Sequence, residues 1–410
     1  MLDKQELQKS TVEWIKKYKR VILQWGTGLG KSKAAIDMTN YLINKKKNLN
    51  IKLNVLLVVA EVAHKNNWND EFKKWNLEEC NLNVDCYASL KKYKNSEFDL
   101  IIFDEAHHLG SDIRMEILST IKTEYVILLS ATLPDNIINY VSSLFGKFKI
   151  SKVTLKQAIT CGIMPKPKVY LIPLTLDDTN INCTIIEEWG ISHKRVIYKC
   201  KYQERWEYIR NKNKYPNAIL YIYCTPFQKY SYLTEQFEYW KKTYFKTRTD
   251  YAKNKWLQAG SNRKRFLGEC KTKYVKELLD KIQDKRYICF CSSIEQASIL
   301  GGEYAIHSKR DDSLSVITDF NNNKINNLFA VGMLQEGQNL SNIDLGIIVQ
   351  LDGKERAFIQ KFGRSMRADS PIQFIFYYKD TKDADYLKNV LEGVNEEYIM
   401  NIDNLNDFKL

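Results

Sequence analysis

The feature that most constrains this chain is a glycine-rich stretch near its N-terminus, residues 25–32, with the sequence WGTGLGKS. An apolar run precedes it at residues 21–23, and a helix-like run follows it at residues 33–43. Glycines allow a tight turn whose backbone N–H groups point inward, directly before the N-terminus of the next helix. This order of strand, loop and helix predicts a site for the β- and γ-phosphates of a nucleotide.

Two side chains of the stretch add to this prediction. Lys31 supplies a positive charge for the phosphates, and the Ser32 hydroxyl can ligate Mg²⁺. The usual pattern begins with Gly or Ala, whereas this chain has Trp25, so a glycine-rich turn without a ligand remains the alternative. The expected phosphate-binding residues are Gly26, Thr27, Gly28, Leu29, Gly30, Lys31 and Ser32.

Composition limits the class of protein. A chain of 410 residues predicts two or three domains. It has no apolar run of about 18 residues and no apolar signal core at its start, so we expect no membrane span and a cytoplasmic protein, in the host cytoplasm if the source is a phage. The nine cysteines include no CxxC pair and predict neither a zinc site nor a disulfide framework.

The net charge of +13 is concentrated in one part of the chain. Residues 183–285 carry 23 basic and 11 acidic side chains, whereas the remainder carries a net charge of only +1. The same segment holds 20 of the 50 aromatic residues. A concentrated basic region suggests a polyanionic partner, and a solvated basic face is the alternative.

The rest of the chain alternates between strand and helix patterns, which predicts an α/β fold. A helix is expected over residues 1–20. Strands are expected at 21–24, 52–60, 84–87, 99–103, 125–129, 169–172, 287–291, 328–331, 345–350 and 373–378. In the middle of the chain, residues 227–259 contain no proline and no glycine and predict one long helix.

A second motif, DEAH at residues 104–107, ends the apolar run 100–103. A phosphate-binding loop needs one carboxylate for Mg²⁺ and another for water, and the end of a neighbouring parallel strand is where both can reach the phosphates. Asp104 would therefore hold the metal, and Glu105 would activate the attacking water. A chance tetrapeptide is the alternative for the motif taken alone.

Two further motifs follow. Ser130-Ala131-Thr132 ends the expected strand 125–129. Residues 360–367, QKFGRSMR, place Arg364 and Arg367 on one face of a helix, which suits stabilisation of a transferring phosphoryl group. A polar strand end and a solvated basic helix are the respective alternatives.

With these motifs in this order, the chain resembles superfamily 2 helicases and translocases that carry a DEAH motif, and is most similar to Swi/Snf-type and phage-like DNA translocases. The resemblance covers about residues 20–182 and 286–390. It implies two RecA-like parallel-sheet domains with ATP and Mg²⁺ in the cleft between them. We expect domain 1 at 1–165, domain 2 at 166–182 and 286–410, and a basic, aromatic-rich helical insertion at 183–285.

The resemblance also implies roles for individual residues. Gln8 would read adenine, Ser32 and Asp104 would hold Mg²⁺, and Gly337 and Asn339 of motif V would contact the nucleotide. The residues implied to couple ATP to nucleic acid are His107, Ser130 and Thr132. The residues implied in catalysis are Glu105, Gln360, Arg364 and Arg367. Residues 287–293 resemble motif IV, and His307 lies in the segment after it that contacts nucleic acid in this family.

Within residues 183–285, basic side chains flank aromatic ones, as expected where phosphates are neutralised and bases are stacked. The alternative is that most aromatics form the inner stripe of a helical hairpin. The expected nucleic-acid contacts are Lys241, Lys242, Lys246, Arg248, Arg263, Lys264 and Arg265.

These observations predict an ATP-dependent motor, a monomer, acting on DNA more than on RNA, with partner proteins of replication, recombination or repair. Three other functions stay open: an RNA helicase, the motor subunit of a nuclease or restriction-type complex, and a nucleic-acid clamp that does not unwind. No nuclease carboxylate cluster is visible in the sequence.

Overall fold

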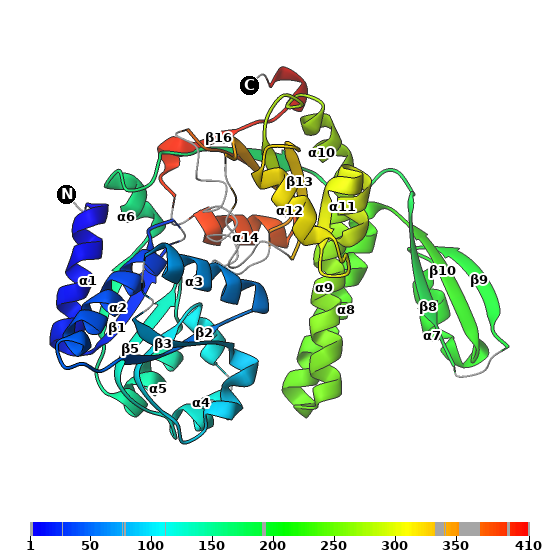
Figure 1. The fold of residues 1–410 in the computed structure, drawn as a ribbon. Coiled ribbons are helices and arrows are strands. Elements are labelled where there is room, and N and C mark those ends of the chain that lie inside the picture. Colours follow the sequence, from blue (N-terminus) through cyan, green and yellow to red (C-terminus); the bar gives the residue numbers. More distant parts are fainter. Residues whose placement is uncertain are drawn as a thin grey trace.

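The computed structural model describes residues 3–26, 28–75, 77, 79–110, 112–190, 194–332, 340, 342–351, 370–391 and 394–408. It contains two large parallel sheets, one in each half of the chain, and a smaller sheet beside a pair of long helices (Figure 1). The expected α/β fold class with two parallel-sheet units is therefore confirmed. No helix in the described part of the chain combines the length and the apolar character that crossing a membrane requires.

The first sheet has the strand order β3-β2-β4-β5-β1-β6, and all its neighbouring strands are parallel. Its strands are β1 (Arg20–Trp25), β2 (Leu53–Val59), β3 (Cys80–Cys86), β4 (Glu97–Phe103), β5 (Lys122–Ser130) and β6 (Lys149–Val153). Its helices are α1 (Lys4–Tyr18), α2 (Lys31–Lys47), α3 (Val62–Lys74), α4 (Asp112–Leu118), α5 (Asp135–Phe145) and α6 (Leu155–Thr160), with 3₁₀ turns η1 (Tyr87–Tyr93) and η2 (Ala106–Leu109).

Helices cover both faces of this sheet because successive strand residues point to opposite sides. Val21 and Leu23 belong to a core layer that includes residues of α1, α2 and α3. Ile22, between them, belongs to a second layer that includes residues of α4 and α5. A strand buried on both faces reads as a continuous apolar run, which is why the sequence pattern located most of these strands. The strands expected from the sequence did not include β6.

The second sheet has the order β12-β13-β11-β14-β15-β7-β16 and is also parallel throughout. Its strands are β7 (Lys168–Leu174), β11 (Tyr287–Phe290), β12 (Ala305–His307), β13 (Asn327–Val331), β14 (Leu345–Ile348), β15 (Ile372–Tyr378) and β16 (Ile399–Asn401). Its helices are α10 (Thr272–Leu279), α11 (Ile294–Gly301), α12 (Ser313–Asn321) and α14 (Lys382–Leu391), with η4 (Gly302–Tyr304), η5 (Glu396–Tyr398) and η6 (Leu405–Asp407). Cys289 and Cys291 are buried in this core.

The segment 183–285, expected to be helical, also contains a three-stranded sheet. Its elements are β8 (Cys183–Glu188), β9 (Val196–Lys201), α7 (Arg205–Arg210), η3 (Lys212–Lys214) and β10 (Ala218–Cys224). β10 lies in the middle, antiparallel to β8 and parallel to β9. The signal for these strands is a period-two alternation, in which Ala218, Leu220 and Ile222 are buried and the residues between them are less so. The basic and aromatic composition obscured it.

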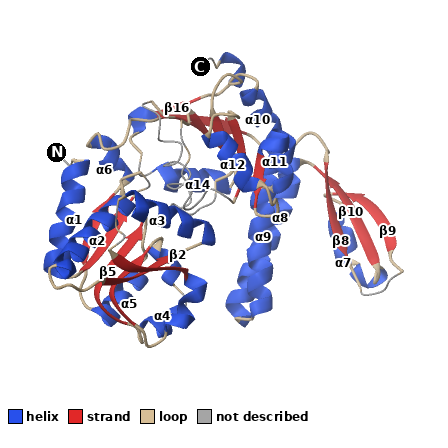
Figure 2. Cartoon of the chain, in the orientation of Figure 1, coloured by secondary structure: helices blue, strands red, loops and turns tan. Residues whose placement is uncertain are grey.

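The single long helix expected over residues 227–259 is instead two helices, α8 (Pro226–Thr247) and α9 (Asp250–Cys270), which form a hairpin (Figure 2). The break occurs at Arg248, whose backbone is left-handed with φ of 55° and whose N–H donates to the Tyr244 carbonyl. Thr249 then caps α9 by accepting a hydrogen bond from the Ala252 N–H. Chains without glycine or proline can still turn where a Thr is able to cap the next helix.

Part of the aromatic stripe packs between the two helices of the hairpin, as the alternative interpretation holds, whereas Phe227, Tyr239, Phe245 and Tyr251 are exposed. The Trp256 ring stacks on Tyr244 at 5.6 Å and lies 6.0 Å from Phe237. Arg263 is also inside the hairpin: it is only 3% exposed, and its guanidinium lies 4.3 Å from the centre of the Phe237 ring. Burial therefore removes Arg263 from the expected phosphate contacts.

A buried ion pair attaches the base of the hairpin to the second sheet. Lys271, between α9 and α10, is fully buried and donates to Asp383 Oδ2 at 2.6 Å, to Gln350 Oε1 at 2.8 Å and to the Val349 carbonyl at 3.0 Å. Burial lowers the pKa of Lys271, against the attraction of Asp383. Gln350 also donates to the second Asp383 oxygen at 2.6 Å.

We predict that Lys271→Ala destabilises the protein by about 3–5 kcal/mol, because the substitution leaves the Asp383 charge buried without its partner. Urea unfolding would measure the change. The matched control is Lys276→Ala on the exposed side of α10, which should change stability by less than about 0.5 kcal/mol. Equal stabilities of the two variants would contradict the assigned role of the pair.

Candidate nucleotide-binding site

The glycine-rich loop connects the carboxyl end of β1 to the first residue of α2, as the sequence predicts. Gly28 and Gly30 have φ angles of 89° and 83°, which other residues adopt only with strain. Gly30 is the N-cap of α2, and no side chain caps this helix. The free N–H groups of its first turn, which includes Ser32, are therefore available to an anion.

Lys31 lies over this loop. Its Nζ donates to the Trp25 carbonyl at 2.9 Å and to the Gly26 carbonyl at 3.5 Å. The cation is thus held at the helix N-terminus, where both the backbone N–H groups and the ammonium favour negative charge.

The unusual first residue of the motif has a structural explanation. Trp25 is fully buried, and its indole N–H donates to the Ser151 hydroxyl at 3.0 Å in the neighbouring strand β6. Its side chain fills the core of the sheet, so its size affects packing and leaves the loop backbone open. The departure from Gly or Ala is therefore compatible with phosphate binding.

Helix α1 places two side chains beside the loop. Gln8 Nε2 donates to the Leu29 carbonyl at 3.4 Å, and Lys4 Nζ donates to the Gly28 carbonyl at 3.1 Å. A Cβ atom at Gly30 would lie 2.1 Å from Gln8 Nε2, the end of a flexible side chain, so the positive φ of Gly30 is what favours glycine here. Gln8 lies next to the phosphate loop, and its role in reading a base stays a prediction.

Asp104 follows the end of β4 and is partly buried beside the phosphate loop. Burial raises its pKa, the nearby Glu105 charge raises it further, and the positive charge of Lys31 lowers it. Trp68 Nε1 donates to Asp104 Oδ2 at 2.8 Å. A buried carboxylate beside a phosphate-binding loop is stabilised by a cation, so Asp104 and Ser32 fit the Mg²⁺ that such a loop binds with its nucleotide.

The DEAH motif and the Ser130–Thr132 motif meet beside this carboxylate. His107 Nδ1 lies 3.3 Å from Glu105 Oε2 and 3.3 Å from the Ser130 hydroxyl, which in turn donates to the Thr132 carbonyl at 2.6 Å. Glu105 adopts a left-handed backbone with φ of 48°, which is uncommon for a residue with a side chain. Strained backbone of this kind is typical of functional positions.

Several expected site residues lie elsewhere or outside the described part of the chain. His307 ends β12 in the second sheet, and the remaining expected nucleic-acid contacts lie on the hairpin. The residues outside the described ranges are Thr27, Gly337, Asn339, Gln360, Arg364 and Arg367.

The structure adds residues to which the sequence assigned no role in the site. Trp68 contacts Asp104 as described, and the Tyr87 hydroxyl donates to the Asp104 carbonyl at 2.8 Å. His64 is buried, and its charge lowers the pKa of Asp104. Only the tertiary structure, which brings α3 and η1 to the end of β4, shows what these side chains contact.

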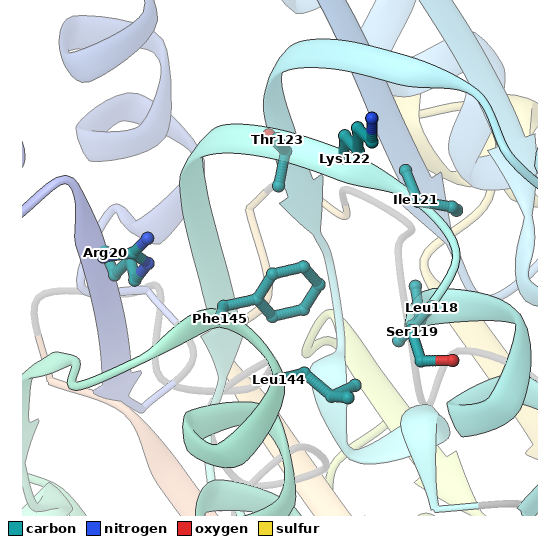
Figure 3. A pocket seen from close by; sticks show the side chains of 8 residues that line it. All are labelled: Arg20, Leu118, Ser119, Ile121, Lys122, Thr123, Leu144 and Phe145. Atoms are coloured by element: carbon teal, nitrogen blue, oxygen red, sulfur yellow. The ribbon is translucent and has the colours of Figure 1, made fainter.

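A cavity of about 250 Å³ lies at the amino ends of the strands of the first sheet, whereas the phosphate loop lies at their carboxyl ends (Figure 3). Arg20, Lys122 and Thr123 line it from the amino ends of β1 and β5, away from the phosphate loop. It is therefore separate from the nucleotide site. Among the described residues, no three His, Cys, Asp or Glu side chains gather as a metal site of their own.

Three protein-family models match parts of the chain. A SNF2-related domain matches residues 7–98, the res subunit of type III restriction enzymes matches residues 79–135, and the helicase conserved C-terminal domain matches residues 270–369. The first two cover the phosphate loop and the DEAH motif, and the third covers much of the second sheet. A comparison with curated protein sequences finds no match.

Solved structures show the same fold. Saccharomyces cerevisiae Dbp5 bound to RNA and ADP BeF3 matches with a TM-score of 0.59 and 10% identity, over 97% of this chain and 89% of that chain. A variant of Dbp5 in the same complex matches with a TM-score of 0.60, 10% identity and the same coverage. A variant bound to Gle1 and IP6 matches with a TM-score of 0.58 and 10% identity, over 97% of this chain and 88% of that chain.

We predict that Trp68→Phe weakens the affinity for a fluorescent ADP analogue in Mg²⁺ by about tenfold, because a hydrogen bond to a charged group contributes about 1.5–3 kcal/mol. Phe keeps an aromatic side chain at this buried position and removes the N–H donor. The control is Trp75→Phe at the end of α3, whose indole N–H donates to Glu71 on the surface at 3.1 Å. If both variants bind equally well, Trp68 does not support Asp104.

Proposed function

We propose that the chain is an ATP-driven motor that moves along nucleic acid, and that it prefers DNA to RNA. The proposal rests on its superfamily 2 helicase domains, which imply nucleic-acid-dependent ATPase and helicase activity. One observation carries the proposal: four polar side chains gather at the carboxyl ends of the neighbouring strands β4, β5 and β1. They are Lys31, Asp104, Glu105 and Ser130. The preference for DNA is supported by the similarity to Swi/Snf-type translocases.

In this proposal, each described residue of the site has its own role in ATP hydrolysis. Lys31 and the N-terminus of α2 bind the terminal phosphates, and Gln8 contacts the base. Ser32 and Asp104 would hold Mg²⁺, which would supply positive charge to neutralise the phosphates. Glu105 accepts a proton from the water whose oxygen bonds to the terminal phosphorus, while the bond to ADP breaks. His107 orients Glu105 through their 3.3 Å contact and links it to Ser130 and Thr132.

The second sheet completes this cycle in our proposal. Arg364 and Arg367, with Gln360, approach the terminal phosphate when the two sheet units close, and Gly337 and Asn339 contact the same nucleotide. A guanidinium that arrives on closure stabilises the transition state more than bound ATP. We propose the limits 1–165 for the first unit, 166–182 with 286–410 for the second, and 183–285 for the accessory segment.

The accessory hairpin supports nucleic-acid binding by its charge. Residues 183–285 carry a net charge of +12, and the rest of the chain only +1. Lys242, Lys246 and Arg248 are exposed near the tip of the hairpin. There the Arg248 guanidinium lies 4.9 Å from the centre of the Phe245 ring, which is 51% exposed. We propose that this tip, with Lys241, Lys264, Arg265 and His307, contacts the phosphate backbone.

A second candidate is the motor subunit of a nuclease complex, which the match to the res subunit of type III restriction enzymes favours. Apart from the Mg²⁺ site proposed at Ser32 and Asp104, no three His, Cys, Asp or Glu side chains gather as a metal site among the described residues, so DNA cleavage would require another chain. Phosphate release measured with single-stranded DNA, duplex DNA and RNA tests the main proposal. Turnover that none of the three stimulates would reject it.

We predict that Glu105→Gln retains nucleotide binding but slows turnover by about 10²-fold or more, because the general base is removed. Lys31→Ala should instead weaken nucleotide binding, since the phosphates are then without a charge-assisted hydrogen bond. Steady-state phosphate release together with a nucleotide titration separates the two effects. Turnover of Glu105→Gln near the wild-type rate would reject the role of Glu105.

We also predict that a fourfold Ala variant binds duplex DNA more weakly than the wild type. The variant changes Lys241, Lys242, Lys246 and Arg248. The slope of log K against log salt should fall by about 0.9 for each phosphate that is no longer neutralised. A double variant of the basic residues Lys16 and Lys17 in the last turn of α1 serves as the control and should keep the wild-type slope. An unchanged slope in the fourfold variant would assign the tip to a protein partner or to packing.

A further inference from the structure

The small sheet has one covered and one open face. Residues of β10 that point to the covered face, Ala218, Leu220, Ile222 and Cys224, are at most 1% exposed. They form a core with Trp189 and the tyrosines of α7 and its flanking turns. The residues between them point to the other face, and Tyr223 there is 37% exposed. Figure 1 shows this sheet projecting from the hairpin side of the molecule, away from both large sheets.

Strand register defines which side chains share the open face, because directly paired residues point to the same side. Tyr221 pairs with Ile186 of β8 and with Lys199 of β9. Tyr223, two residues further along β10, pairs with Thr184 of β8 and Lys201 of β9. The face therefore has two tyrosines on its central strand, two exposed lysines beside them on the edge strand β9, and the exposed Ile186 and Ile197 on its two edge strands.

The charge of this face is positive. Among the described residues, no acidic side chain forms an ion pair with Lys199 or Lys201. The one acid of the face, Glu188, is paired with Arg195. Residues 183–224 as a whole carry eight basic and four acidic side chains.

We propose that this open face, which we call the tyrosine face and define by Tyr221, Tyr223, Lys199 and Lys201, binds single-stranded nucleic acid. The two tyrosines stack on successive bases, and the two lysines neutralise the phosphates beside them. The inference rests on the proposed function and assigns it a second contact surface, separate from the tip of the hairpin.

Geometry and composition favour this ligand over the alternatives. Residues two apart on a strand lie about 7 Å from each other, so each ring is accessible to its own base. A duplex keeps its base faces stacked inside, so only an unpaired strand can use the rings. The centre of a protein interface is depleted in lysine, whereas here two lysines lie directly beside the aromatic side chains.

The test uses two double variants. One changes both Tyr221 and Tyr223 to Leu, and the other changes both to Phe, which keeps the two rings. Fluorescence anisotropy without nucleotide measures binding to oligo(dT), oligo(U) and duplex DNA. We expect the Leu variant to bind single strands at least about tenfold more weakly, the Phe variant within about twofold of wild type, and duplex binding to change little. Tyr140→Leu on α5, where the tyrosine is also 37% exposed, is the surface control.

The oligo(dT) and oligo(U) arms distinguish DNA from RNA as the source of the strand. A second double variant, Lys199→Gln with Lys201→Gln, leaves the rings in place and should lower the salt slope for single strands by about 0.7 for each lysine that neutralises a phosphate. Unchanged single-strand affinity and slope in folded variants would reject the tyrosine face while leaving the motor proposal intact. Failure of the wild-type protein to bind any of the three probes would reject both.

Discussion

Parallel strand pairing is the constraint on which the nucleotide site depends. In the first sheet β4, β5 and β1 are neighbours, although β4 and β1 are separated by more than seventy residues of sequence. Their carboxyl ends lie at one edge, so the glycine-rich loop after β1, the carboxylates after β4 and Ser130 at the end of β5 come together there. A ligand that binds at this edge contacts groups from three strands without any of them leaving the sheet.

The burial of Asp104 determines what surrounds it. A carboxylate removed from water has a raised pKa and is stable as an anion only beside donors and cations. Trp68 supplies a donor from α3, and Lys31 supplies charge from the loop. This requirement ties α3, β4 and α2 together, and it explains why the site includes a tryptophan that has no obvious part in phosphate chemistry.

A buried polar contact attaches the accessory segment to the second sheet. The buried contact between Lys271 and Asp383 joins the end of α9 to α14, and Gln350 joins both to the end of β14. These contacts join the base of the hairpin to the second sheet. Rings such as Phe237, Tyr244 and Trp256 pack inside the hairpin, and Arg263 is buried with them.

The sequence by itself predicted two parallel-sheet units, although not β6, β12 or β16, and it placed Lys31, Asp104 and Glu105 at strand ends, because continuous apolar runs and glycines act over a few neighbouring residues. Only the tertiary structure decided the contact of Trp68 with Asp104, the burial of Arg263, the turn at Arg248 and the shared face of Tyr221 and Lys199. Each of these depends on strand register or on helix packing between segments far apart in the chain. Local patterns carry no information about which distant surface a side chain will meet.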